Sequence, residues 1–212
     1  MKEDILEQIG HDWIQQQNGK YVKTNLKYRP DINNTTYEYN KSTDTIHSDI
    51  DILAIDLNDI ETVTVINCKS WMDGFNFKLF HENLYSKENH NKMFGGKEFW
   101  KHFRDLIDPK WHNAFIERIK LENPRFKKLE YIILNVYSKN KDWVNKWKDI
   151  EMIKNNFQRT DIELLSIESI EIIELIKQIE TKGSEYAENS DFTRILQLLR
   201  VVETQNKMHS TQ

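Results

Sequence analysis

Three polar residues stand at the ends of two short apolar runs near the middle of the chain. Asp51 comes directly before the run Ile52–Ile55, and Asn67 and Lys69 end the run that begins at Val63. Because side chains alternate along a β-strand, Asn67 and Lys69 are expected on one face of the second strand. A carboxylate, an amide and an ammonium group would then meet at one end of a sheet.

The segment between the two runs predicts a β-hairpin. The adjacent residues Asn58 and Asp59 tolerate the backbone angles of a tight turn, and β-branched residues flank them on both sides. A bend centred near Asp59 places Asp51 opposite Asn67 on the neighbouring strand. The polar groups of both strands are therefore expected at the same end of the hairpin.

This combination of groups suits the hydrolysis of a phosphodiester. A divalent cation polarises the phosphoryl oxygen and lowers the pKa of the attacking water, and Mg²⁺ prefers oxygen ligands such as carboxylates and carbonyls. A lysine beside the cation can orient the water and stabilise charge in the transition state. The pattern predicts such roles for Asp51 and Lys69.

The hairpin resembles the catalytic signature of the PD-(D/E)xK nuclease superfamily, whose fold is called restriction-endonuclease-like. Asp51 matches the first acid and Lys69 matches the lysine, whereas Asn67 stands where the family usually has Glu or Asp. Glu7, on a predicted N-terminal helix, matches an acid that the family carries on a helix. The resemblance implies hydrolysis of DNA, in defence or repair, with Mg²⁺ or Mn²⁺ held by Asp51, Asn67 and the backbone carbonyl of Cys68.

Asn67 leaves two interpretations open. An amide oxygen can bind Mg²⁺ but brings no negative charge, so activity needs another carboxylate, with Asp49 as the nearest candidate and Glu7 and Glu38 as more distant ones. Alternatively, the chain is a degenerate nuclease fold that binds nucleic acid or a protein partner without cutting it. Asp at a strand start and Lys at a strand end are also common solvated positions.

The composition indicates one domain of ordinary size. The 212 residues are enough for one sizeable core, and no apolar run reaches membrane-spanning length. We therefore expect a cytoplasmic protein that does not enter the membrane. The single cysteine, Cys68, excludes an internal disulfide and a cysteine-rich zinc site.

The net charge of −4 means that a nucleic-acid surface must come from segregated charge. Basic residues outnumber acidic ones between residues 97 and 148, and acidic residues dominate between 149 and 191. The densest basic group is expected either to contact DNA phosphates or to form solvated helix faces, and it consists of Lys110, Arg118, Lys120, Arg125, Lys127 and Lys128. The family resemblance also allows a homodimer.

The remaining pattern predicts helices on both sides of a sheet. Helices are expected over residues 3–17, 97–107, 111–121, 143–157 and 170–179, and strands over 21–28, 129–137 and 162–165, with a short strand possible at 37–39. Residues 77–91 are polar with scattered aromatic residues. The fold class is α/β, with a restriction-endonuclease-like mixed central sheet flanked by helices. Residues 1–182 form the expected nuclease-like domain, and residues 183–212 a linker and a helix packed on it.

Overall fold

The computed structural model describes residues 5–33, 36–89 and 92–182, and the predicted C-terminal linker and helix lie outside these ranges. At its centre is a five-stranded sheet in the order β1-β2-β3-β7-β9. These strands span Lys20–Tyr28, Ser48–Asp56, Thr62–Lys69, Lys128–Asn135 and Glu163–Glu171. β1, β2 and β3 pair antiparallel, whereas β3, β7 and β9 pair parallel, so the predicted mixed sheet is confirmed.

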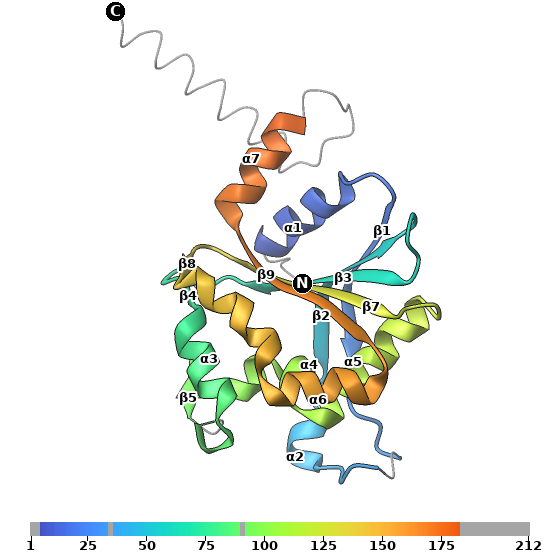
Figure 1. Cartoon of the computed structure of the whole chain (residues 1–212), viewed down its shortest axis with the longest axis vertical. Coiled ribbons are helices and arrows are strands. Elements are labelled where there is room, and N and C mark those ends of the chain that lie inside the picture. The colour runs from blue at the N-terminus through green and yellow to red at the C-terminus, as the bar shows by residue number, and fades with distance from the viewer. Residues whose placement is uncertain (1–4, 34–35, 90–91, 183–212) are drawn as a thin grey trace, which may run out of the picture.

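Helices cover both faces of this sheet (Figure 1). One layer contains α1 (Ile5–Gln15) and α7 (Ile172–Lys182). The layer on the other face contains α3 (Phe77–Tyr85), α4 (Arg104–Ile107), α5 (Pro109–Glu122) and α6 (Glu151–Thr160). The short α2 (Lys41–Asp44) lies beyond the N-terminal end of β2. Within the described ranges, every helix is too short or too polar to cross a bilayer.

The alternation of apolar residues along the strands explains the two layers. Ile52 and Ile66 pack with Leu6 and Ile9 of α1 in one hydrophobic cluster. Their neighbours in sequence point to the other side, where Leu53 joins a larger cluster with the helices of the second layer. The central strands therefore bury both faces, as their nearly continuous apolar runs predict.

The predicted hairpin is confirmed, and its register agrees with a bend near Asp59. β2 and β3 are antiparallel, with Ile52 paired to Ile66 and Leu53 to Val65. One further step along this ladder places Asp51 opposite Asn67. The turn is held by the Asp59 carboxylate, whose Oδ2 accepts a hydrogen bond from Thr62 Oγ1 at 2.8 Å.

Several element boundaries differ from the sequence predictions. The helix expected over 143–157 is a 3₁₀ helix (Lys141–Asp149) followed by α6, because Ile150 between them takes an extended backbone that buries its side chain. The helix expected over 97–107 is similarly divided at Phe103, where a 3₁₀ turn (Phe99–His102) ends and α4 begins. The possible strand at 37–39 is absent, and β9 is longer than predicted because it pairs along the whole of β7.

The polar-looking segment after β3 forms a helix, α3, whose buried side is aromatic. Phe80 of α3 is fully buried, and its ring centroid lies 4.7 Å from Phe75, 4.9 Å from Phe99 and 5.6 Å from Phe103. Most of these contacts are edge-on or offset, the arrangements that aromatic quadrupoles favour. This aromatic layer forms the floor under the C-terminal end of β3.

Helix α5 carries a fully buried histidine, His112. Its Nδ1 donates to the backbone carbonyl of Asp105 at 2.7 Å, which fixes the neutral tautomer with Nε2 facing Thr160 Oγ1 at 3.3 Å. Burial, as the largest cause, lowers the pKa of His112 to about 4. The imidazole is therefore neutral in the folded protein at pH 7.

We expect His112 to make the protein less stable in acid. As the pH falls from about 6.5 to 5, the unfolded chain takes up a proton at this residue and the folded chain does not, so the free energy of unfolding falls by about 2 kcal/mol. Urea denaturation at pH 7 and pH 5 checks this, because His112→Gln removes the contribution. Asp51, whose pKa is raised, acts in the opposite direction, so the wild type must be compared with the variant. Equal pH dependence in the two proteins would contradict the prediction.

Candidate functional site

Asp51 lies near the N-terminal end of β2, where its carboxylate reaches across to β3. Its Oδ2 accepts a hydrogen bond from the backbone N–H of Cys68 at 2.6 Å. Burial, the largest cause, raises the pKa of Asp51 to about 6, against the opposing effects of the Lys69 charge and the Cys68 N–H. Cys68 lies in the extended backbone of β3, where the N–H and C=O of one residue point to the same side, so its carbonyl is expected on the side of β2 as well.

Lys69 ends β3 above the aromatic layer. Its Nζ lies 5.0 Å from the centroid of the Phe103 ring, and no residue in the described ranges forms an ion pair with it. Burial lowers the pKa of Lys69, while the negative charges of Asp51 and Asp105 raise it. An ammonium group in this setting is held close to carboxylates without being neutralised by direct contact.

Asn67 faces the same layer and is only half satisfied. Its Nδ2 donates to Tyr131 Oη at 2.8 Å. Its Oδ1 is buried and has no hydrogen-bond partner among the described residues. Buried acceptors without partners are rare, and each one costs about 1–3 kcal/mol unless a water, an ion or a ligand completes it.

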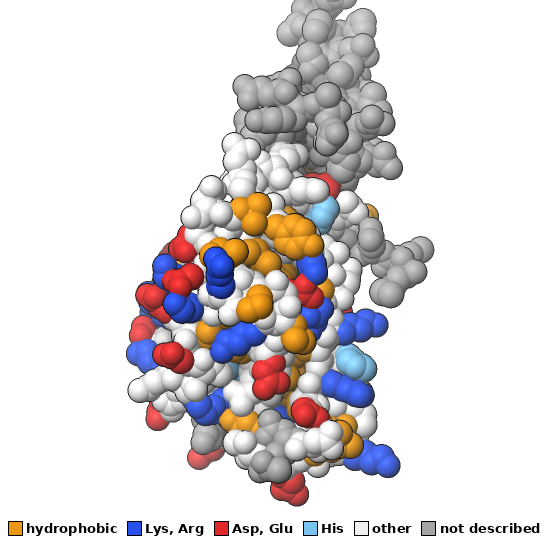
Figure 2. Space-filling view, turned by 90° about the vertical axis from the view of Figure 1, so that its right-hand side faces the viewer, with side chains coloured by type: hydrophobic (Ala, Val, Ile, Leu, Met, Phe, Trp, Pro, Cys, Tyr) orange, Lys and Arg blue, Asp and Glu red, His pale blue; other side chains and the backbone are white. Residues whose placement is uncertain are grey.

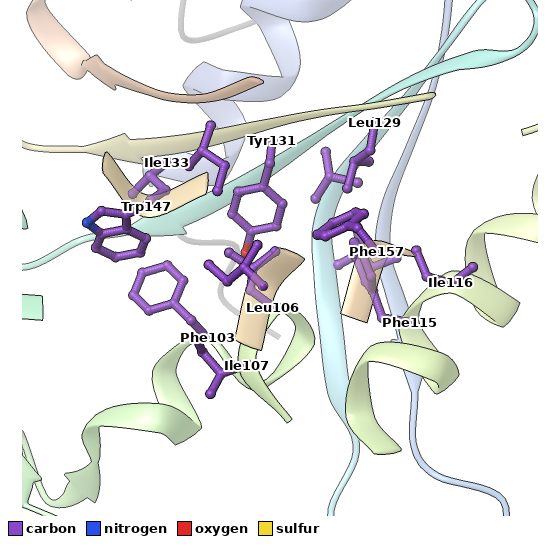
Figure 3. Packing of buried hydrophobic residues seen from close by; sticks show 14 of the residues in the cluster. Phe103, Leu106, Ile107, Phe115, Ile116, Leu129, Tyr131, Ile133, Trp147 and Phe157 are labelled. Carbon is purple, nitrogen blue, oxygen red and sulfur yellow. The ribbon is translucent and has the colours of Figure 1, made fainter. Parts of the chain in front are cut away.

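A residue that sequence reasoning missed, Asp105, belongs to the same cluster. Tyr131 Oη donates to Asp105 Oδ2 at 2.6 Å, and both side chains are almost completely buried. Tyr131 projects from β7 toward α4, where Leu106 packs beside it (Figure 3). Burial raises the pKa of Asp105, against the Tyr131 hydrogen bond and the Lys69 charge, which lower it. These residues gather near the C-terminal end of the central strand β3, and we call them the β3-edge cluster below: Asp51, Asn67, Lys69, Tyr131 and Asp105.

Arg104 precedes Asp105 on α4, and its charge acts on the Asp105 carboxylate. Its guanidinium lies 3.7 Å from the ring centroid of Trp111, and its Nε donates to Ser48 Oγ at 3.2 Å. Its Nη2 also donates to the backbone carbonyl of His47 at 3.3 Å. These contacts join α4 to the start of β2. They also place a cation near Asp49, which is exposed and affects Asp51 only through its charge.

The structure does not bring Glu7 to this site, in contrast to the sequence prediction. α1 covers the opposite face of the sheet, where Leu6 and Ile9 pack against Ile52. Glu7 lines a separate polar pocket of about 160 Å³ that other residues of α1 and β1 complete. Because the sheet lies between α1 and the β3-edge cluster, the Glu7 carboxylate cannot share a cation with Asp51.

The densest basic group of the sequence offers fewer unpaired cations than its composition indicates. Four of its six members form ion pairs with carboxylates: Lys110 with Asp44, Arg118 with Glu122, Lys127 with Glu61, and Lys128 with Asp59. In the register of β3 and β7, Lys128 lies opposite Thr62 at the start of β3. This position is about 20 Å along the strand from Lys69. On the face drawn in Figure 2, basic and acidic side chains are interspersed.

The donor set of the β3-edge cluster fits a hard divalent cation such as Mg²⁺ or Mn²⁺ in its chemistry. It combines the carboxylate of Asp51, the partnerless amide oxygen of Asn67 and the carbonyl of Cys68, all oxygen donors. The set is poor in charge, and within the described ranges no group of three or more His, Cys, Asp or Glu side chains could hold a metal ion. The orphan oxygen of Asn67 is the observation in favour of a cation.

Comparison with known proteins assigns no family. The chain matches no family model, no curated protein and no solved structure.

Proposed function

We propose that this protein hydrolyses phosphodiester bonds of DNA with the help of Mg²⁺ or Mn²⁺, on a restriction-endonuclease-like fold. The observation that carries the proposal is the buried, partnerless Oδ1 of Asn67 in a cluster with Asp51 and Lys69. The mixed sheet, the hairpin and the order of acid, amide and lysine along it support the proposal.

Each residue has a distinct role in this proposal. Asp51, Asn67 and the Cys68 carbonyl hold the cation, which when bound polarises the scissile phosphate and acidifies the attacking water. Lys69 orients that water and stabilises the negative charge that develops on the phosphate. The lowered pKa of Lys69 suits a group that exchanges a proton during the reaction.

Asp51→Asn tests the role of the carboxylate. The substitution keeps the shape of the side chain and removes its charge, so we expect the rate of DNA cleavage in Mg²⁺ to fall about 1,000-fold. The measurement is cleavage of a supercoiled plasmid and of a linear duplex, each with Mg²⁺ and with Mn²⁺. Asp142→Asn, at an exposed residue of the 3₁₀ helix Lys141–Asp149, is the control and should retain the wild-type rate. Equal rates for Asp51→Asn and wild type would remove Asp51 from the mechanism.

A second function is favoured by the neutral side chain of Asn67. An amide brings no charge for a cation, and its Nδ2 is already committed to Tyr131. In this alternative the protein is a degenerate nuclease fold that binds nucleic acid without cutting it. DNA binding that weakens steeply with salt, together with no cleavage in either metal, would support this alternative and contradict the first proposal.

A further inference from the structure

The hydrogen bonds of the β3-edge cluster run in one direction. The hydroxyl of Tyr131 has a single hydrogen, which it gives to Asp105 Oδ2 at 2.6 Å. The hydroxyl oxygen can then only accept a hydrogen bond from position 67, and the amide of Asn67 supplies one at 2.8 Å. An ionised carboxylate at position 67 has no hydrogen to give, so an ionised Asp105 on one side of the Tyr131 hydroxyl requires a donor on the other.

The same chain of hydrogen bonds fixes which way the amide of Asn67 points. Because Nδ2 faces Tyr131, Oδ1 is turned away from it and is left buried without a partner among the described residues. Asp51 stands opposite Asn67 in the ladder and is the acid of the neighbouring strand. Asp105 and Tyr131 thus orient the side chain of Asn67 so that its amide oxygen, and not its amide N–H group, faces away from Tyr131.

The number of charged groups in the cluster also equals that of the family pattern. The pattern has two acids and a lysine along the hairpin, and this chain has Asp51, Lys69 and the buried Asp105 contributed by α4. Asp105 acts electrostatically on both Asp51 and Lys69. The charges of two carboxylates therefore act on one lysine, although one of the carboxylates comes from a different part of the chain.

We propose that Asp105 supplies the negative charge that the PD-(D/E)xK pattern places at position 67. Through the hydroxyl of Tyr131, Asp105 also holds the amide of Asn67 in the orientation in which its oxygen can act as a metal ligand. Asp105 and Tyr131 are positioning residues in this proposal. The inference rests on the proposed function for its purpose, but the coupling of the three side chains is a property of the folded protein and can be measured without activity.

The test is a double-mutant cycle of Asn67→Asp and Asp105→Asn, measured by urea unfolding. In Asn67→Asp the Tyr131 hydroxyl lies between two carboxylates, so we expect the unfolding equilibrium constant to rise about 30-fold. In the double variant the chain of hydrogen bonds reverses, because the new amide at position 105 can donate to Tyr131, and the Tyr131 hydroxyl can donate to the new carboxylate at position 67. The constant should then return to within about threefold of that of the Asp105→Asn single variant. An Asn67→Asp effect of the same size in both backgrounds would overturn the proposal.

Mn²⁺ affinity is a second measurement. If Asp105 and Tyr131 only stabilised the fold, their substitution would not change this affinity in the pattern expected here. Calorimetric titration should show about tenfold weaker Mn²⁺ binding in Asp105→Asn and recovery in the double variant, which again has two acids. If Asn67→Asp does not fold, Tyr131→Phe replaces it: this variant should weaken Mn²⁺ binding, whereas Tyr37→Phe should not, because the Tyr37 hydroxyl accepts its hydrogen bond from Asn113 and not from a residue of the cluster. Unchanged binding in Tyr131→Phe would overturn the proposal.

These measurements separate the two proposals. If positions 67 and 105 are coupled but the wild-type protein neither binds Mn²⁺ nor cuts DNA, the hydrogen-bond relation stands and the proposed nuclease function is wrong. Metal-dependent cleavage without such coupling would do the reverse.

Discussion

Replacing Lys69 by methionine is expected to lower the rate of DNA cleavage about 1,000-fold, within the range that general acid–base and electrostatic catalysis contribute. Methionine keeps an apolar stem of similar length over Phe103 but removes the ammonium group. The wild-type ammonium forms no ion pair with any residue of the described ranges, so its removal leaves no carboxylate without a direct partner. The folded structure should therefore survive the substitution.

The measurement is single-turnover cleavage of a labelled duplex at saturating protein, accompanied by thermal unfolding of each variant. Lys154→Met is the matched control, because Lys154 lies on α6 and pairs with Asp149 at the surface. A fall in rate with an unchanged melting temperature supports a role of Lys69 in the reaction. A rate within about threefold of wild type, well below a catalytic contribution, would show that Lys69 is only a strand-end residue.

The largest effect on stability is expected from Phe80→Ala in the aromatic layer. Phe80 is fully buried, and its ring contacts Phe75, Phe99 and Phe103. Truncation to alanine removes this apolar surface and leaves a cavity that the surrounding rings fill only in part. We expect the free energy of unfolding to fall by about 3–5 kcal/mol.

Urea denaturation measures this loss, and Phe80→Leu is the conservative comparison. Leucine fills most of the volume, so its cost should be clearly smaller than that of alanine. A loss below about 1 kcal/mol for Phe80→Ala, far under the usual cost of such a truncation, would mean that the layer is loosely packed and that Lys69 does not stand on a rigid floor.

The hairpin and its polar residues could be predicted from the sequence because they depend on local rules. Strand alternation and the turn at Asn58 and Asp59 fix the register, and the register alone brings Asp51 to Asn67. The aliphatic run of β7 could be recognised for the same reason. In these segments, neighbours in sequence decide the structure, and the predicted strands are confirmed.

Glu7 and Asp105 show where such reasoning ends. The helical stripe of α1 predicts that the helix packs on a sheet, but not on which face, and the face decides whether Glu7 can join Asp51. Asp105 lies between Arg104 and Leu106 in a segment whose buried stripe could be recognised. Its contact with Tyr131 depends on how α4 docks against β7, which no spacing in the sequence specifies.

The site face of the sheet is lined largely by one stretch of chain. α3, α4, α5 and the aromatic layer all belong to the connection between β3 and β7, whose paired residues Thr64 and Glu130 are 66 positions apart. Insertions, deletions and substitutions within that connection can reshape the wall around Lys69 while the strand pairings stay as they are. Under the proposed function, selection can therefore act on this connection to change the shape of the substrate site, because the only proposed site residue that it carries is Asp105.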